Sequence, residues 1–129
     1  MLQNCPIYAY IPAANVARAR KFYEEKVGLK PSEEEIDGGV AYPFADHTAA
    51  FLYDAGDSAG TSKASQAFWK VEDVEREVAQ LRSKGVQFEH YEPSEIGGLT
   101  MKGDIAEGAG TKVAWFKDTE GNIMALVQD

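Results

Sequence analysis

The chain of 129 residues has one cysteine, two histidines and no long hydrophobic run. Cys5 has no partner for an internal disulfide, and its place beside a proline at the start of a predicted strand favours a structural role over a nucleophilic one. No apolar stretch approaches the roughly 20 residues of a membrane-spanning helix, and the first residues lack the basic and apolar regions of a secretion signal. We therefore expect a cytoplasmic protein with no membrane partner.

Positive charge is also scarce. The 21 acidic residues outnumber the 13 lysines and arginines, which gives a net charge of −8, and the basic residues form no run. Proteins that bind nucleic acids neutralise phosphates with basic patches, and phosphate cradles need a glycine-rich turn between a strand and a helix. Because the sequence has neither feature, it argues against a nucleic acid or nucleotide partner.

The chain does contain an internal repeat. Residues Tyr8–Val16 reappear 58 positions later as Gln66–Val74, and each copy is an alternating strand pattern that ends in a helix cap, Asn15 or Asp73. A repeat of this length indicates two modules with the same fold. Neither half is large enough to bury a core well by itself, so we expect one domain that both modules share. This single domain is expected to span 1–129, with module 1 at about 6–54, a linker at 55–65 and module 2 at about 66–129.

The hydrophobic periodicity assigns the same order of elements to both modules. In the first module, a helix follows the strand at 7–11 and ends at Gly28, and the next elements are strands at 29–36, 40–44 and 49–53, with a turn at 37–39. In the second, a helix ends at Gly85, and strands are expected at 86–91, 112–116 and 122–128. The glycine-rich residues 92–110 are expected to form a long loop, typical of a lid or binding segment. The fold class is therefore α+β, with two tandem βαβββ modules.

Three segments carry a resemblance to a known superfamily: Asn15–Tyr23, Val27–Leu29 and Trp115–Asn122. Together with the tandem modules, they resemble the vicinal oxygen chelate superfamily, which contains glyoxalases, bleomycin resistance proteins and extradiol dioxygenases. The resemblance implies a cupped mixed sheet with the helices on the outside, a ligand site inside the cup, and a homodimer.

Metal-dependent members of that superfamily place one ligand on the first strand and one on the last strand of each module. The resemblance and the repeat assign these four positions to Tyr8, Tyr53, Gln66 and Ala125. A divalent catalytic site needs about three converging nitrogen or oxygen ligands, whereas a neutral phenol is a poor ligand and alanine has nothing to donate. We therefore expect no metal and no other cofactor.

The same positions favour a ligand cavity. Tyr8 and Tyr53 are as compatible with core packing as with a cavity wall, but their repeat-related positions favour the cavity. Aromatic walls suit a flat or apolar organic molecule. The residues expected to form this site are Tyr8, Tyr10, Tyr53, Gln66, Phe68, His90, Trp115 and Ala125.

The sequence leaves catalysis open. His90 alternates with Val86 and Phe88 along a predicted strand and would act as a general base if it faced the cavity, although a half-buried strand histidine fits the pattern as well. We expect His47 to be an exposed residue of a turn. We expect the acidic run at 33–35 to lie on a solvated surface. The sequence thus favours a metal-independent small-molecule-binding protein. The alternative is a lyase, isomerase or dioxygenase-like enzyme that uses His90, a cavity tyrosine, or a divalent metal at a non-standard site.

Overall fold

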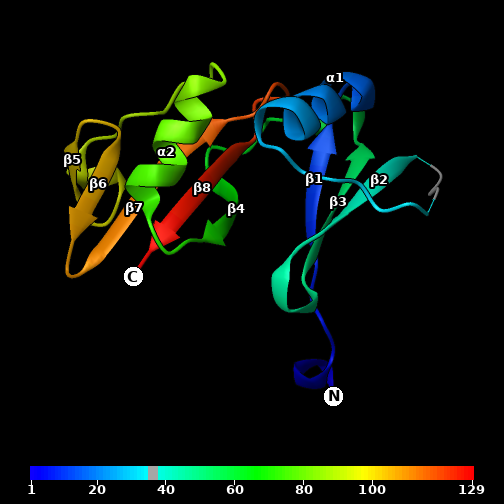
Figure 1. Cartoon of the computed structure of the whole chain (residues 1–129), viewed down its shortest axis with the longest axis horizontal. Helices are drawn as coiled ribbons and strands as arrows, with labels where there is room; N and C mark the ends of the chain where they lie inside the picture. Colours follow the sequence, from blue (N-terminus) through cyan, green and yellow to red (C-terminus); the bar gives the residue numbers. More distant parts are fainter. Residues whose placement is uncertain (35–37) are drawn as a thin grey trace. The chain divides into compact units, whose positions relative to one another are not determined.

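The computed structural model describes residues 1–34 and 38–129. The chain forms two compact units, each of which is a β-sheet with a helix packed on it (Figure 1). The first unit contains residues 1–61 and 119–122, and the second contains 62–118 and 123–129. The α+β class predicted from the sequence is confirmed.

The first unit has a mixed sheet of three strands in the order β1-β3-β2. The strands are β1 (Ala9–Ala13), β2 (Gly39–Pro43) and β3 (Ala49–Asp54). β1 pairs with β3 in parallel, whereas β2 pairs with β3 antiparallel. Burial alternates along each strand, as a sheet with one covered and one open face requires.

The helix of the first unit covers one face of this sheet. It begins as α1 (Val16–Lys21) and continues as the π-helical turn η2 (Phe22–Lys26). Asn15 caps it as predicted, because its Oδ1 accepts a hydrogen bond from the Arg18 N–H at 3.0 Å. Gly28 follows with a φ of 84°, a conformation that favours glycine, and ends the helix as predicted.

The second unit has a mixed sheet of five strands in the order β4-β8-β7-β6-β5. β4 pairs with β8 in parallel, and the other pairs are antiparallel. The strands are β4 (Ser65–Lys70), β5 (Thr100–Lys102), β6 (Ile105–Gly108), β7 (Thr111–Lys117) and β8 (Ile123–Gln128).

Helix α2 (Val74–Ser83) covers one face of the second sheet and packs on β7 and β8. Its predicted cap is confirmed, since the Asp73 carboxylate accepts a hydrogen bond from the Arg76 N–H at 3.1 Å. On the covered face, Trp69 stacks on Phe116 with ring centroids 6.3 Å apart, and Phe88 meets Phe116 edge-on. Aromatic packing therefore links β4, β7 and the segment around Phe88.

Two predicted strands differ from the structure. In the described part of the segment predicted at 29–36, residues 29–34 form no strand and make one backbone bond to β2, from Ser32 N to Ala41 O. Pro31 has no N–H to donate, which disfavours a regular ladder there. Residues 35 and 36 of this strand and Asp37 of the predicted turn lie outside the described residues. The segment predicted at 86–91 is reduced to one bridge between Phe88 and Phe116 and a bond from Glu89 N to Trp115 O.

The long loop predicted at 92–110 is wrong in part. It contains the 3₁₀ turn η5 (Pro93–Glu95) and the hairpin of β5 and β6. These strands have only three and four residues, too few to give a clear period, and Gly103 with Asp104 is the turn signal that marks them. The remaining short turns are η1 (Leu2–Asn4), η3 (Ala45–His47) and η4 (Gly56–Ser58). Within the described residues, none of the helices has the length and apolar character needed to cross a membrane.

Candidate ligand-binding site

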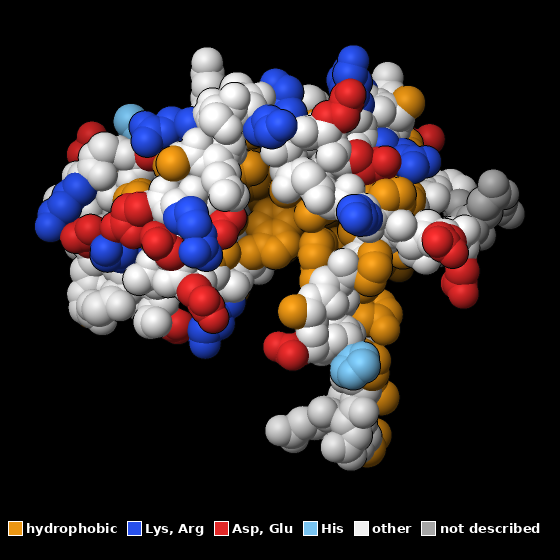
Figure 2. Space-filling view, in the orientation of Figure 1, with side chains coloured by type: hydrophobic (Ala, Val, Ile, Leu, Met, Phe, Trp, Pro, Cys, Tyr) orange, Lys and Arg blue, Asp and Glu red, His pale blue; other side chains and the backbone are white. Residues whose placement is uncertain are grey.

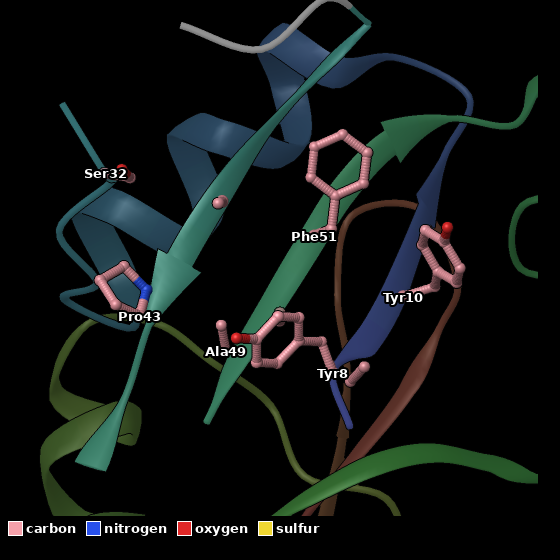
Figure 3. A pocket seen from close by; sticks show the side chains of 9 residues that line it. Tyr8, Tyr10, Ser32, Pro43, Ala49 and Phe51 are labelled. Carbon is pink, nitrogen blue, oxygen red and sulfur yellow. The ribbon is translucent and has the colours of Figure 1, made fainter. Parts of the chain in front are cut away.

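The open face of the first sheet carries aromatic side chains. Tyr8 and Tyr10 are 56% and 62% exposed. The cause is strand alternation: Ile11 and Leu52 point to α1 and are fully buried, so their neighbours point to the other side. Figure 3 shows the rings of Tyr10 and Phe51 on β1 and β3, and the ring of Tyr8 just before β1.

A cavity of about 540 Å³ lies against this face. Its lining combines three aromatic rings with small side chains and one serine hydroxyl (Figure 3). The lining residues are Tyr8, Ala9, Tyr10, Ser32, Ala41, Pro43, Ala49, Ala50 and Phe51. Of these described residues none carries a charged side chain, so the cavity is apolar with three hydroxyl groups that can donate or accept hydrogen bonds.

Small residues on β2 and β3 leave room for this cavity. Ala41 pairs with Phe51 across the two strands, and Ala49 pairs with Pro43, so no large aliphatic side chain fills the space between the rings. Further along β2, a Cβ atom at Gly39 would lie 3.1 Å from Cζ of Phe51 and would collide with the Leu52 carbonyl oxygen. Gly39 therefore lets the Phe51 ring lie over β2.

The cavity rings belong to a larger aromatic cluster that includes Tyr53. Tyr10 meets Tyr53 edge-on with centroids 4.9 Å apart, and it meets Phe51 at 6.2 Å with 65° between the ring planes. Phe51 and Tyr53 are nearly parallel at 6.4 Å. Tyr53 does not line the cavity, but it supports the Tyr10 ring from the side.

The end of β1 is held by a residue distant in sequence. The Glu120 side chain, fully buried, accepts hydrogen bonds from Arg18 Nε at 2.8 Å and from the backbone N–H groups of Ala14 and Asn15 at 2.9 Å. The Arg18 guanidinium is the main reason that the pKa of Glu120 falls to about 2. This carboxylate fixes the turn from β1 into α1.

Asn122 makes a second link in the same segment. Its Nδ2 donates to the Pro12 carbonyl at 2.7 Å, and its Oδ1 accepts from the Gly60 N–H at 3.3 Å. The sequence identified this segment, Thr119–Asn122, as part of a family pattern and as the connection between two strands of the second module. Its role in the structure is to position β1, which carries Tyr10 and directly follows Tyr8.

The second unit carries four predicted site residues on its own sheet. Phe68 and Trp115 flank Ala125 in register on the neighbouring strands β4 and β7, and Ala125 is 3% exposed. Tyr91 meets Trp115 edge-on at 5.3 Å. Gln66 is exposed and lies at a bulge of β4 between Ser65 and Ala67.

The two histidines lie outside the lining of the cavity. His90 is 60% exposed, and its Nε2 lies 2.7 Å from Oδ1 of Asp104, whose other oxygen accepts a hydrogen bond from Arg82 at 3.1 Å. His47 is exposed in the turn η3 with a φ of 62°. His90 therefore has an orienting carboxylate, as a general base would, but it belongs to a charged surface cluster of the second unit.

The four family ligand positions do not fit a divalent metal. Tyr8 and Tyr53 offer two phenol groups in the first unit, while Gln66 and Ala125 offer one amide in the second, and these are poor donors for such an ion. Residues 1–34 and 38–129 contain no group of three histidine, cysteine, aspartate or glutamate side chains arranged to hold a metal ion.

The sequence and the fold identify the family. Residues 7–126 match the model of the Glyoxalase/Bleomycin resistance protein/Dioxygenase superfamily, and the chain belongs to this superfamily. The predicted resemblance is thereby confirmed. A search of curated proteins finds no match.

Solved structures show the same fold. TnmS3, an antibiotic binding protein from Streptomyces sp. CB03234, is 19% identical, with a TM-score of 0.72 over 99% of this chain and 98% of that one. UcmS2 is 18% identical, with a TM-score of 0.72 over 95% and 96% of the two chains. A glyoxalase/bleomycin resistance protein/dioxygenase from Alicyclobacillus acidocaldarius is 16% identical, with a TM-score of 0.70 over 97% and 91%.

Proposed function

We propose that the protein binds a flat, apolar or aromatic organic molecule without a metal, and that the cavity of the first unit takes up this ligand. The observation that carries the proposal is the pair of tyrosines, each more than half exposed, that lines a cavity of about 540 Å³ on the open face of a sheet. Aromatic side chains exposed on one face mark interaction sites more often than isolated exposed residues do.

The size and the chemistry of the cavity suit a small ligand. Its volume lies within the range of about 300–1,000 Å³ typical of ligand pockets. The rings of Tyr8, Tyr10 and Phe51 offer faces and edges for stacking, and burial of apolar surface contributes roughly 25 cal/mol for each Å². The phenol groups and the Ser32 hydroxyl supply the few hydrogen bonds that orient such a ligand.

Two further observations favour binding over metal-dependent turnover. The family ligand positions hold Tyr8, Tyr53, Gln66 and Ala125, whose donors are too weak and too few for a catalytic metal. In addition, TnmS3 is an antibiotic binding protein, which supports small-molecule binding as a use of this fold.

Isothermal titration calorimetry with a panel of uncharged planar aromatic compounds tests the proposal. We expect one-to-one binding for at least one compound, and we expect Ala49→Phe, which fills the cavity, to weaken it at least tenfold, a loss of about 1.4 kcal/mol. Ala79→Phe is the matched control, because Ala79 is exposed on α2 of the second unit. His90→Gln should also leave the affinity unchanged.

Two outcomes contradict the proposal. One is the absence of binding across the panel. The other is equal binding by wild type and Ala49→Phe, provided that circular dichroism shows both to be folded. If His90→Gln abolished binding while Ala49→Phe did not, the ligand would belong to the surface cluster of the second unit and the assignment to the first unit would be wrong.

A further inference from the structure

We propose that the cavity of the first unit selects ligands whose aromatic ring system carries a positive charge and rejects their anionic analogues. This inference rests on the proposed function and names the charge class of the ligand. It is carried by three features of the first unit: the aromatic faces in the cavity, the absence of cationic side chains from its described lining, and the placement of the basic residues elsewhere.

The aromatic faces are the first feature. Tyr8, Tyr10 and Phe51 all line the cavity, and the planes of Tyr10 and Phe51 are 65° apart at 6.2 Å. The two rings meet edge to face, so they present differently oriented aromatic surfaces to the cavity. The face of an aromatic ring carries negative electrostatic potential, and a ligand cation within about 6 Å of the ring centroid is attracted to it. An anion in the same place is repelled.

Within the described residues, the lining offers nothing that would neutralise an anion. The cavity contains no lysine, arginine or histidine side chain, and its polar groups are three hydroxyls. Hydroxyl groups solvate a carboxylate less well than a guanidinium or an ammonium group does. An anionic ligand would therefore lose water without gaining a charge partner.

The basic residues of the first unit lie on other elements. They are Arg18, Arg20, Lys21, Lys26 and Lys30. The first four belong to α1 and η2, which pack on the sheet through the face opposite the exposed rings, and Arg18 and Arg20 already pair with Glu120 and Glu24. None of these basic residues is among the residues that line the cavity.

The net charge of the first unit also favours a cationic ligand. The first unit contains ten acidic residues against these five basic ones. In Figure 2, hydrophobic side chains gather over the strands of this unit, whereas charged side chains of both signs gather over α2 and β6 of the second unit. An excess of negative charge raises the local concentration of cations, within a screening length of about 8 Å at physiological salt.

Three tricyclic probes with the same ring system isolate the charge: acridine at pH 8, N-methylacridinium and acridine-9-carboxylate. Each is titrated into the full chain in 0.15 M salt and followed by its own fluorescence. We expect N-methylacridinium to bind at least about fivefold more tightly than acridine and at least about twentyfold more tightly than the carboxylate. Equal or tighter binding of the carboxylate would overturn the proposal.

Two substitutions at one position test whether the rings cause the preference. Tyr10→Phe keeps an aromatic face, so the preference for the cation should persist. Tyr10→Leu keeps the apolar area but removes the face, so the ratio between N-methylacridinium and acridine should fall at least threefold while acridine still binds. If Tyr10→Leu kept the full preference for N-methylacridinium over acridine, net charge alone would attract the cation. That result would overturn the role of the cavity rings.

The failure of this inference is distinct from the failure of the proposed function. If acridine and its carboxylate bind as tightly as the cation, and Ala49→Phe weakens all three, the cavity binds aromatic molecules without charge selection and only the present inference is wrong. If none of the three tricyclic probes binds, both this inference and the aromatic site on which it rests are overturned.

Discussion

Glu120 and Arg18 form a two-point ion pair in the first unit, although 102 positions separate them in the sequence. Nε of Arg18 donates to Oε2 of Glu120 at 2.8 Å, and its Nη2 donates to Oε1 at 2.9 Å. The Glu120 side chain is fully buried, whereas the Arg18 side chain is about half exposed. The pair therefore holds a buried carboxylate at the start of α1, next to the strand that carries the cavity tyrosines.

Glu120→Gln should lower the free energy of unfolding by about 3 kcal/mol at pH 7, because it removes the charge that Arg18 and two backbone N–H groups stabilise. Urea unfolding measures this loss. Glu25→Gln, which changes an exposed carboxylate in the π-helical turn η2 of the same helix, is the control and should change stability by less than about 0.5 kcal/mol.

The ion pair between Glu120 and Arg18 also predicts that the stability of the protein depends on pH. The pKa of Glu120 falls from 4.5 to about 2 on folding, so the stabilisation is fully present above about pH 5 and is lost as the pH falls towards 2. The difference in stability between wild type and Glu120→Gln should shrink over this window. A difference that stays constant from pH 7 to pH 3 would show that the charge of Glu120 does not matter.

Gly60→Ala should destabilise the protein by more than 2 kcal/mol. Its φ is 70°, and a Cβ atom there would collide with the carbonyl oxygen of Glu120. Gly56→Ala is a matched control, because Gly56 has a φ of 56° but nothing within 4 Å of an added Cβ. It should cost only the strain of the left-handed backbone, about 1 kcal/mol. Equal losses of melting temperature in both variants would contradict the predicted contact.

The purified protein should hold well below one equivalent of zinc, nickel, iron or manganese per chain after dialysis. The reason is the donor chemistry of Tyr8, Tyr53, Gln66 and Ala125. Inductively coupled plasma mass spectrometry measures the content. A stoichiometric metal that survives dialysis, and whose removal lowers the melting temperature, would refute the prediction.

The chain should form a homodimer in solution. Among the described residues, the first sheet has three strands with β1 and β2 at its edges, which favours pairing with a further surface. Light scattering at micromolar concentration should give twice the mass of 14.1 kDa. A measured mass equal to that of one chain would contradict the predicted homodimer and would show that the edge strands are covered in another way.

The sequence predicted the parts of the fold that have a strong local signal. The caps Asn15 and Asp73 were found because a short polar side chain precedes a helical period in each case. The strand predicted at 29–36 was wrong over its described residues, because local alternation does not show whether a neighbouring ladder is available. The short hairpin of β5 and β6 was missed because three or four residues do not establish a period.

The candidate site was predictable in part. The family resemblance selected Tyr8, and strand alternation from that position added Tyr10; both residues line the cavity. Ser32, Ala41 and Phe51 were not selected, because their place at the cavity depends on the register between β2 and β3 and on a segment after α1. The register between two strands depends on tertiary structure and cannot be predicted from the local pattern of a single sequence.

The segment Thr119–Asn122 has a consequence for the order of folding. The first unit takes Glu120 and Asn122 from near the end of the chain, so residues 1–61 alone lack the groups that bind Ala14, Asn15 and Pro12. Contacts over such long sequence separations form late and slow the search for the native state. During synthesis, residues 1–61 therefore lack these contacts until residues 119–122 have also been made.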